Sequence, residues 1–171
     1  MRDAGSEQGR CDVGIVIALS ELLPIRNRAR DEGKTVVFTN GCFDLLHLGH
    51  VHYLGRARQF GDILVVGLND DASVTRVKGE GRPIIPEDER ASIVAALECV
   101  DYVTIFGETT PARLIAALVP DVLVKGGDYR VEDIVGRETV EGAGGRVEVV
   151  EPVPGRSTSG LIRAICGQFG P

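Results

Sequence analysis

Two kinds of segment alternate along this chain, and the alternation restricts its fold to a small set. Short runs rich in β-branched residues predict strands at 36–38, 63–68, 102–106, 122–124 and 147–150. The first four runs are almost continuously apolar, as expected of strands that are covered on both faces. Segments with helical spacing lie between the runs, so the order along the chain is strand, helix, strand, helix.

Helix-start signals stand at the beginning of the intervening segments. The expected helices cover residues 20–33 with Ser20 as the cap, residues 50–60, a segment that opens at Pro86, one that opens at Thr110-Pro111, and one capped within 157–159. Capping hydroxyls, a first-turn proline and the acidic residues after Pro86 are typical of helix N-termini. A shorter helix is expected between the second strand and Lys78.

This order predicts a doubly wound α/β domain with a parallel, Rossmann-like sheet. A chain of 171 residues is long enough for one such domain and too short for two ordinary ones. We therefore expect a loose tail at 1–12 and a single domain at 13–171. Parallel sheets of this kind bind ligands at the carboxyl ends of their strands, so residues that follow strands are the candidates for function.

Composition excludes several classes of protein. The net charge of −6 argues against a general nucleic-acid binder, and no apolar stretch is long enough to span a membrane. The four cysteines form no C-x-x-C pair, which favours reduced thiols. Acidic residues precede the apolar run at 13–19, unlike a secretory signal peptide. We therefore expect a cytoplasmic protein.

The residues that carry chemistry follow the first strand. All three histidines of the chain fall within six positions, His47, His50 and His52. Gly49 and His50 are expected at a helix start, where free N–H groups and the helix dipole favour an anion. The spacing lets His47 and His50 converge on one phosphate, while His52 points away.

Two other interpretations of the histidines stay open at this point. Such a pair can be an incidental surface feature or a satisfied core pair. Alternatively, His47 and His50 could bind zinc together with Cys42 or Asp44.

The segment TNGCFDLLHLGH resembles the signature of the H-x-G-H nucleotidyltransferase superfamily. Further matches follow in the family's order: KGEGRPI at 78–84, EDER at 87–90, VKGGDY at 124–129 and GRSTS at 155–159. Together the motifs look most like members that adenylylate D-glycero-β-D-manno-heptose 1-phosphate, which yields ADP-heptose from ATP. Because no sugar-kinase domain fits in this length, the resemblance implies a free-standing form.

The resemblance implies a role for each site residue. Phosphate contact and catalysis fall to His47, His50, Lys78 and Arg82. Nucleotide binding falls to Thr39, Asn40, Gly41, Phe43, Gly49, Gly126, Asp128, Arg156, Ser157, Thr158 and Ser159. Substrate binding falls to Asp44 and Cys42, and Cys42 is expected to be a small buried residue rather than a nucleophile. Ser159 replaces the family's common threonine, and Arg156 replaces a commonly uncharged residue.

The implied reaction is in-line attack of a sugar 1-phosphate on the α-phosphorus of ATP, with pyrophosphate leaving. Because the nucleophile is already an anion, alignment and charge neutralisation suffice. We expect Mg²⁺ to arrive with ATP and no protein metal ligand, and a homo-oligomer of two or more copies. The rival interpretations are a cytidylyltransferase acting on glycerol 3-phosphate or a related phosphate, and a nucleotide-sensing module without activity.

Overall fold

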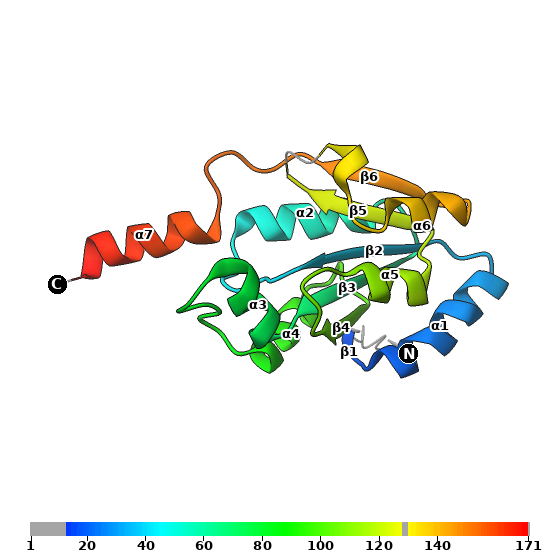
Figure 1. Cartoon of the computed structure of the whole chain (residues 1–171), viewed down its shortest axis with the longest axis horizontal. Coiled ribbons are helices and arrows are strands. Elements are labelled where there is room, and N and C mark those ends of the chain that lie inside the picture. Colours follow the sequence, from blue (N-terminus) through cyan, green and yellow to red (C-terminus); the bar gives the residue numbers. More distant parts are fainter. Residues whose placement is uncertain (1–12, 128–129, 171) are drawn as a thin grey trace, which may run out of the picture.

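The computed structural model describes residues 13–127 and 130–170. In these residues six parallel strands form one sheet in the order β1-β4-β3-β2-β5-β6 (Figure 1). The strands are β1 (Ile15–Val16), β2 (Val36–Gly41), β3 (Ile63–Asn69), β4 (Tyr102–Phe106), β5 (Val122–Gly126) and β6 (Arg146–Val150). The expected doubly wound α/β fold is confirmed.

Helices cover both faces of the sheet. They are α1 (Leu19–Asp31), α2 (Leu48–Arg58), α3 (Asp71–Lys78), α4 (Glu87–Ala95), α5 (Ala112–Leu118), α6 (Arg137–Gly142), α7 (Thr158–Phe169) and the 3-10 turn η1 (Val131–Asp133). One buried cluster joins α2 and α4 to the sheet, and a second joins α1, α5 and α6 to the opposite face.

Neighbouring strand residues alternate between these two clusters. In β2, Val37 belongs to the cluster with α2 and α4, while Val36 and Phe38 belong to the cluster with α1 and α5. All three side chains are at most 1% exposed. This period of two, with both faces buried, is why the strands read as unbroken apolar runs.

The strand order reverses direction beside β2. The chain passes from β2 to β3 and β4 on one side, and then returns to place β5 and β6 on the other. Such a reversal leaves a crevice at the carboxyl ends of the strands, because the connections on the two sides diverge. The polar residues at the ends of β2, β3 and β5 therefore meet at one edge of the sheet.

Several boundaries differ from the sequence expectation. Ser20 is not a cap, because α1 begins at Leu19 with Ala18 in the N-cap position. Helix α2 begins two residues earlier than expected, which makes His47 its N-cap residue. The short strand β1 and helix α6 were not expected, since neither carries a long apolar pattern. The tail expected at 1–12 lies outside the described residues.

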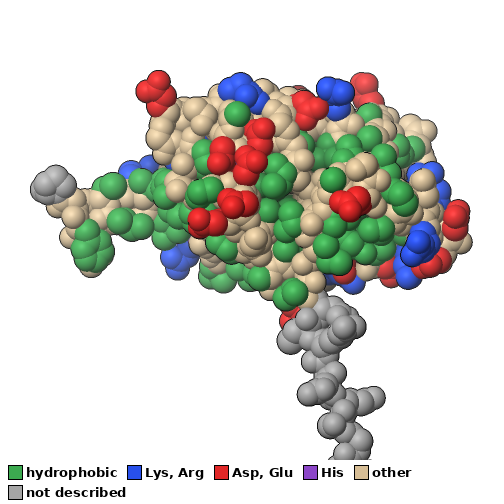
Figure 2. Space-filling view, turned by 90° about the horizontal axis from the view of Figure 1, so that it is seen from below, with side chains coloured by type: hydrophobic (Ala, Val, Ile, Leu, Met, Phe, Trp, Pro, Cys, Tyr) green, Lys and Arg blue, Asp and Glu red, His purple; other side chains and the backbone are tan. Residues whose placement is uncertain are grey.

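The last helix stands apart from the body. Helix α7 projects from the end of the molecule where the strands terminate, and none of its residues is fully buried (Figure 1). Apolar side chains lie along it, with Ile165 and Phe169 exposed (Figure 2). No helix in the described ranges is long and apolar enough to cross a membrane.

Candidate active site

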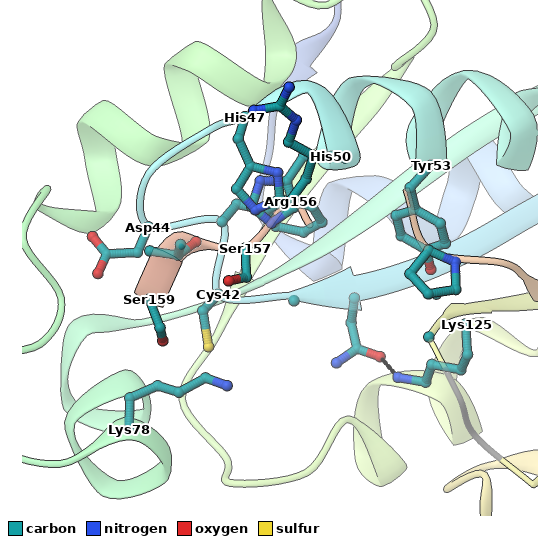
Figure 3. A pocket seen from close by; sticks show the side chains of 18 of the residues that line it. Cys42, Asp44, His47, His50, Tyr53, Lys78, Lys125, Arg156, Ser157 and Ser159 are labelled. Atoms are coloured by element: carbon teal, nitrogen blue, oxygen red, sulfur yellow. Dashed lines mark hydrogen bonds between the residues drawn. The ribbon is translucent and has the colours of Figure 1, made fainter. Parts of the chain in front are cut away.

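A cavity of about 530 Å³ lies at the carboxyl ends of β2, β3 and β5. The loops that follow these strands, the start of α2, the end of α3 and the start of α7 form its walls (Figure 3). It brings together residues more than 100 positions apart in the sequence, from Asn40 to Ser159. The cavity therefore sits where the reversal of strand order predicts a ligand site.

The start of α2 supplies two histidines to the cavity. The rings of His47 and His50 stack with their centroids 3.9 Å apart. Gly49 makes this possible, because a Cβ at that position would lie 2.9 Å from the His47 ring. His52, in contrast, is exposed and does not line the cavity. The structure thus brings together the two histidines that the spacing selects, and their contact with a phosphate stays a prediction.

Both imidazoles favour the neutral form. Burial, with the charge of His47 as the lesser cause, lowers the pKa of His50 to about 4. Burial and the nearby Arg156 lower the pKa of His47. The Nδ1 atom of each ring is buried and has no hydrogen-bond partner among the described residues. Orphaned polar atoms of this kind are rare in folded proteins, and at the wall of a cavity they indicate a ligand.

The start of α7 forms the wall beside the histidines. Ser157 caps the helix by accepting a hydrogen bond from the Gly160 amide at 3.1 Å. The Thr158 hydroxyl donates to the Leu45 carbonyl at 3.3 Å, which ties α7 to the loop after β2. Arg156 adds a positive charge to this helix N-terminus. Amides and cations arranged in this way are suited to phosphate oxygens.

The carboxylate of Asp44 anchors the loop between α3 and α4. Its buried carboxylate pairs with Arg82 and accepts hydrogen bonds from the amides of Ile84 (2.7 Å) and Ile85 (3.1 Å). Burial alone would raise the pKa of Asp44, but these hydrogen bonds outweigh it and the pKa is lowered. The expected contact of Asp44 with acceptor hydroxyls has to compete with these partners. Within the protein, Asp44 holds Arg82 and its loop against the cavity.

Arg90 is a buried strut beneath the same loop. It is 1% exposed and donates to the carbonyls of Cys42, Asn69 (2.9 Å) and Ile85 (2.8 Å). It also pairs with Asp71 at 2.7 Å. Its bonds thus join the ends of β2 and β3 to the loop before α4. Arg90 does not line the cavity, so its role is to hold the residues that do.

Two aromatic side chains shape the wall formed by α2. The Tyr53 hydroxyl bonds to Thr39 and donates to the Val124 carbonyl at 3.0 Å, and its ring lies against Gly126, where a Cβ would come within 2.8 Å. Thr39 is therefore buried beneath the cavity and does not line it. Phe43 adopts a positive φ of 47° and packs on His50 at 5.3 Å between ring centroids.

Lys125 is the penultimate residue of strand β5 and lines the cavity. It was not predicted as a site residue. Its ammonium donates to the Asn40 side-chain oxygen at the end of β2. Burial lowers the pKa of Lys125 to about 8. The available signal was a lysine that directly follows the apolar run at 122–124, because charge in a central strand is costly unless it is used.

Most of the expected site residues line this one cavity. Those that do are Asn40, Gly41, Cys42, Phe43, Asp44, His47, Gly49, His50, Lys78, Arg82, Gly126, Arg156, Ser157, Thr158 and Ser159. Asp128 lies outside the described residues. Burial raises the pKa of the Cys42 thiol, which disfavours the thiolate. In the described part of the chain, no three His, Cys, Asp or Glu side chains are grouped to hold a metal ion.

The chemistry that this wall can supply is narrow. It offers imidazoles, ammonium and guanidinium groups, hydroxyls and a helix N-terminus. Of the two carboxylates that line it, Asp44 is engaged by protein donors and Glu151 is exposed. Such a set neutralises and aligns phosphate groups. Catalysis that proceeds through an enzyme nucleophile would require an activated side chain instead.

Comparisons with known proteins agree with this geometry. A cytidylyltransferase-like family model matches residues 38–164. The bifunctional protein HldE of Citrifermentans bemidjiense is 63% identical over 142 residues, which are 83% of this chain and 29% of that protein. HldE of Pseudomonas paraeruginosa is 51% identical over 164 residues, 96% of this chain and 33% of that protein. The chain thus spans about a third or less of the length of these curated relatives.

Two solved structures share the fold. A lipopolysaccharide core biosynthesis protein from Thermoplasma volcanium is 30% identical, with a TM-score of 0.58 over 71% of this chain and 98% of that chain. A pantoate-β-alanine ligase from Francisella tularensis is 13% identical, with a TM-score of 0.59 over 85% of this chain and 69% of that chain. The second likeness concerns the fold alone.

Proposed function

This chain belongs to the cytidylyltransferase-like family of nucleotidyltransferases, and on that premise we propose that it transfers an adenylyl group from ATP to D-glycero-β-D-manno-heptose 1-phosphate. The products are ADP-heptose and pyrophosphate. The observation that carries the proposal is the stacked pair His47 and His50, held over Gly49 and facing the start of α7.

The steps assigned to this chain follow from the charges around the cavity. His47, His50 and the helix start at Ser157 bind the triphosphate. Lys78, at the end of α3, and Arg82, in the loop that follows, neutralise charge as the sugar phosphate oxygen attacks the α-phosphorus. The phosphorus–oxygen bond to the β-phosphate breaks, and pyrophosphate leaves in line. No enzyme base is needed, because the attacking oxygen is already an anion.

The choice of ATP and a heptose phosphate rests on sequence likeness. The motifs TNGCFD, KGEGRPI and VKGGDY support it, as do the relatives named HldE and a relative in lipopolysaccharide core biosynthesis. The competing assignment, CTP with glycerol 3-phosphate, is favoured only by the general description of the family.

Three further expectations belong to the same proposal. Mg²⁺ binds with the triphosphate and is held by phosphate oxygens and water, which suits a wall whose described residues group no metal ligands. The enzyme works in the cytoplasm. It assembles as a homo-oligomer, which is consistent with the exposed apolar side chains Ile165 and Phe169 on α7.

The proposal is tested by pyrophosphate release. The purified chain is incubated with Mg²⁺ and each combination of ATP or CTP with heptose 1-phosphate or glycerol 3-phosphate. We expect release with ATP and heptose 1-phosphate well above every other pair. Turnover of CTP without turnover of ATP would reverse the assignment, and no turnover with any pair would favour a nucleotide-sensing module.

A further inference from the structure

We propose that Lys125 and Asn40 form the acceptor-recognition subsite of the cavity, where they bind hydroxyl groups of the sugar. This assigns Asn40 to the acceptor instead of the nucleotide, which is the ligand that the family resemblance implies for it. This inference rests on the proposed transfer to a sugar phosphate. It concerns two residues at the ends of adjacent strands β5 and β2.

The side chains of Lys125 and Asn40 approach the cavity from one face of the sheet, and the histidines approach it from the other. Along β5, Val124 packs with the cluster of α2 and α4, and Leu123 packs with the cluster of α1 and α5. By the alternation of strand side chains, Lys125 lies on the same face as Leu123. The histidines come from α2 on the other face. Figure 3 shows Lys125 and Lys78 across the cavity from the histidine pair.

This arrangement of the two groups of residues matches what an in-line displacement requires. The attacking oxygen and the leaving pyrophosphate occupy opposite sides of the α-phosphorus. If the triphosphate binds to the histidines and the start of α7, the acceptor enters from the opposite side. Asn40 and Lys125 line that side together with Asn69 at the end of β3. An acceptor held there would lie with its sugar against the strand ends and its phosphate toward Lys78, which lines the same cavity.

The hydrogen bond between the two side chains determines what they offer to a ligand. A lysine ammonium has only donors, so the Asn40 oxygen must face Lys125. The Asn40 amide nitrogen is then free to point elsewhere, and Lys125 keeps two N–H donors. The pair is therefore rich in donors and suits a ligand with several oxygen atoms, such as a polyhydroxylated sugar.

Burial supports a binding role for Lys125 over a structural one. The salt bridges among the described residues include Lys34 but not Lys125. Burial disfavours the charged ammonium and lowers the pKa of Lys125 to about 8. Such a residue contributes little to stability. A ligand that accepts its remaining hydrogen bonds accounts for its presence at the cavity wall.

The test compares Lys125→Met with wild type and with Lys34→Met, an exposed lysine outside the cavity. We expect Lys125→Met to raise the KM for heptose 1-phosphate about tenfold or more, since charge-assisted hydrogen bonds are lost. The KM for ATP should change less than about twofold, and the melting temperature should not fall, because methionine suits the buried site. Lys34→Met should leave both KM values unchanged.

Monodeoxy heptose 1-phosphates make the assignment specific. In wild type, removal of the hydroxyl that Lys125 binds raises KM, and in Lys125→Met the same removal has no further effect. An unchanged KM for every sugar phosphate, or a rise in the KM for ATP alone, overturns the inference. If wild type uses another phosphorylated acceptor, the same variants are measured with that acceptor. Wild type that turns over none counts against the proposed function itself.

Discussion

Among single residues, the pair His47 and His50 matters most for the proposed function. Its two rings are stacked, largely uncharged and unpaired at Nδ1 within the described chain. We expect these neutral imidazoles to bind phosphate by donating hydrogen bonds, while net positive charge comes from Arg156, Lys78 and Arg82. These separate roles of the imidazoles and the cationic side chains lead to two predictions about His50.

Replacement of His50 by alanine should lower kcat by roughly 10²–10³, the usual cost of one well-placed donor to transition-state charge. ATP binding should persist, because the start of α7 still faces the triphosphate. Turnover is measured as pyrophosphate release and binding by calorimetry with a non-hydrolysable ATP analogue. His52→Ala, on the exposed side of the same helix, is the matched control and should leave kcat and ATP binding unchanged. Full activity of His50→Ala would remove His50 from the mechanism.

The stability of the chain should depend on pH through the same residue. The unfolded state protonates His50 near the ordinary pKa of 6.5, and the folded state only near 4. Between these values the unfolded state binds more protons, so the free energy of unfolding decreases as pH falls through this window. Urea denaturation at about pH 7 and about pH 5 measures the decrease. His50→Ala should show a smaller decrease, and an identical one would contradict the assignment.

At the scale of elements, the geometry of the site depends on how α2 begins. Gly49→Ala should displace the His47 ring, because the added Cβ would lie 2.9 Å from it. We expect a fall in kcat of about tenfold or more, since small misplacements are costly in catalysis. Gly55→Ala on the same helix has nothing within 4 Å and is the control. It should keep full activity and gain up to about 1 kcal/mol in stability. Equal effects of the two variants would refute the role of Gly49.

A second element-scale prediction concerns Arg90, which joins the ends of β2 and β3 to the loop before α4. Arg90→Met leaves the carbonyls of Cys42, Asn69 and Ile85 without their donor. We expect a loss of about 3 kcal/mol or more in the free energy of unfolding, because each buried carbonyl that loses its donor costs about 1–3 kcal/mol. Denaturant unfolding measures it.

The comparison for Arg90 is Arg113→Met. The side chain of Arg113 is 87% exposed and pairs only with Glu108, so its loss should be nearly neutral. If Arg90→Met were as mild as Arg113→Met, Arg90 would not be the strut that the hydrogen bonds indicate.

The same scale shows what the sequence could and could not predict. Strands β2 to β5 were predicted because their burial on both faces leaves apolar runs. Strand β6 is less buried and was predicted from its β-branched residues. The two-residue β1 was missed, since so short a strand has no period to detect. Motif spacing located His47, His50 and the start of α7. Lys125 and Tyr53 were missed because their positions depend on the pairing of β2 with β5 and on the packing of α2, neither of which is local in sequence.

At the scale of the whole molecule, the net charge of −6 conceals a cationic centre. Lys78, Arg82, Lys125 and Arg156 line one cavity at the point where the strand order reverses. Because charges within a Debye length of about 8 Å act most strongly, a bound triphosphate experiences this local cluster more than the acidic average. The fold thus assembles, from distant segments, a cationic cavity that the net charge of the chain does not reveal.

The most direct test of the account is identification of the product. The chain is incubated with ATP, Mg²⁺ and D-glycero-β-D-manno-heptose 1-phosphate, and the mixture is analysed by mass spectrometry and phosphorus NMR. We expect ADP-heptose and pyrophosphate in equal amounts, with neither formed when CTP replaces ATP. Formation of a cytidylyl product from CTP, or of no nucleotide sugar from ATP, would contradict it.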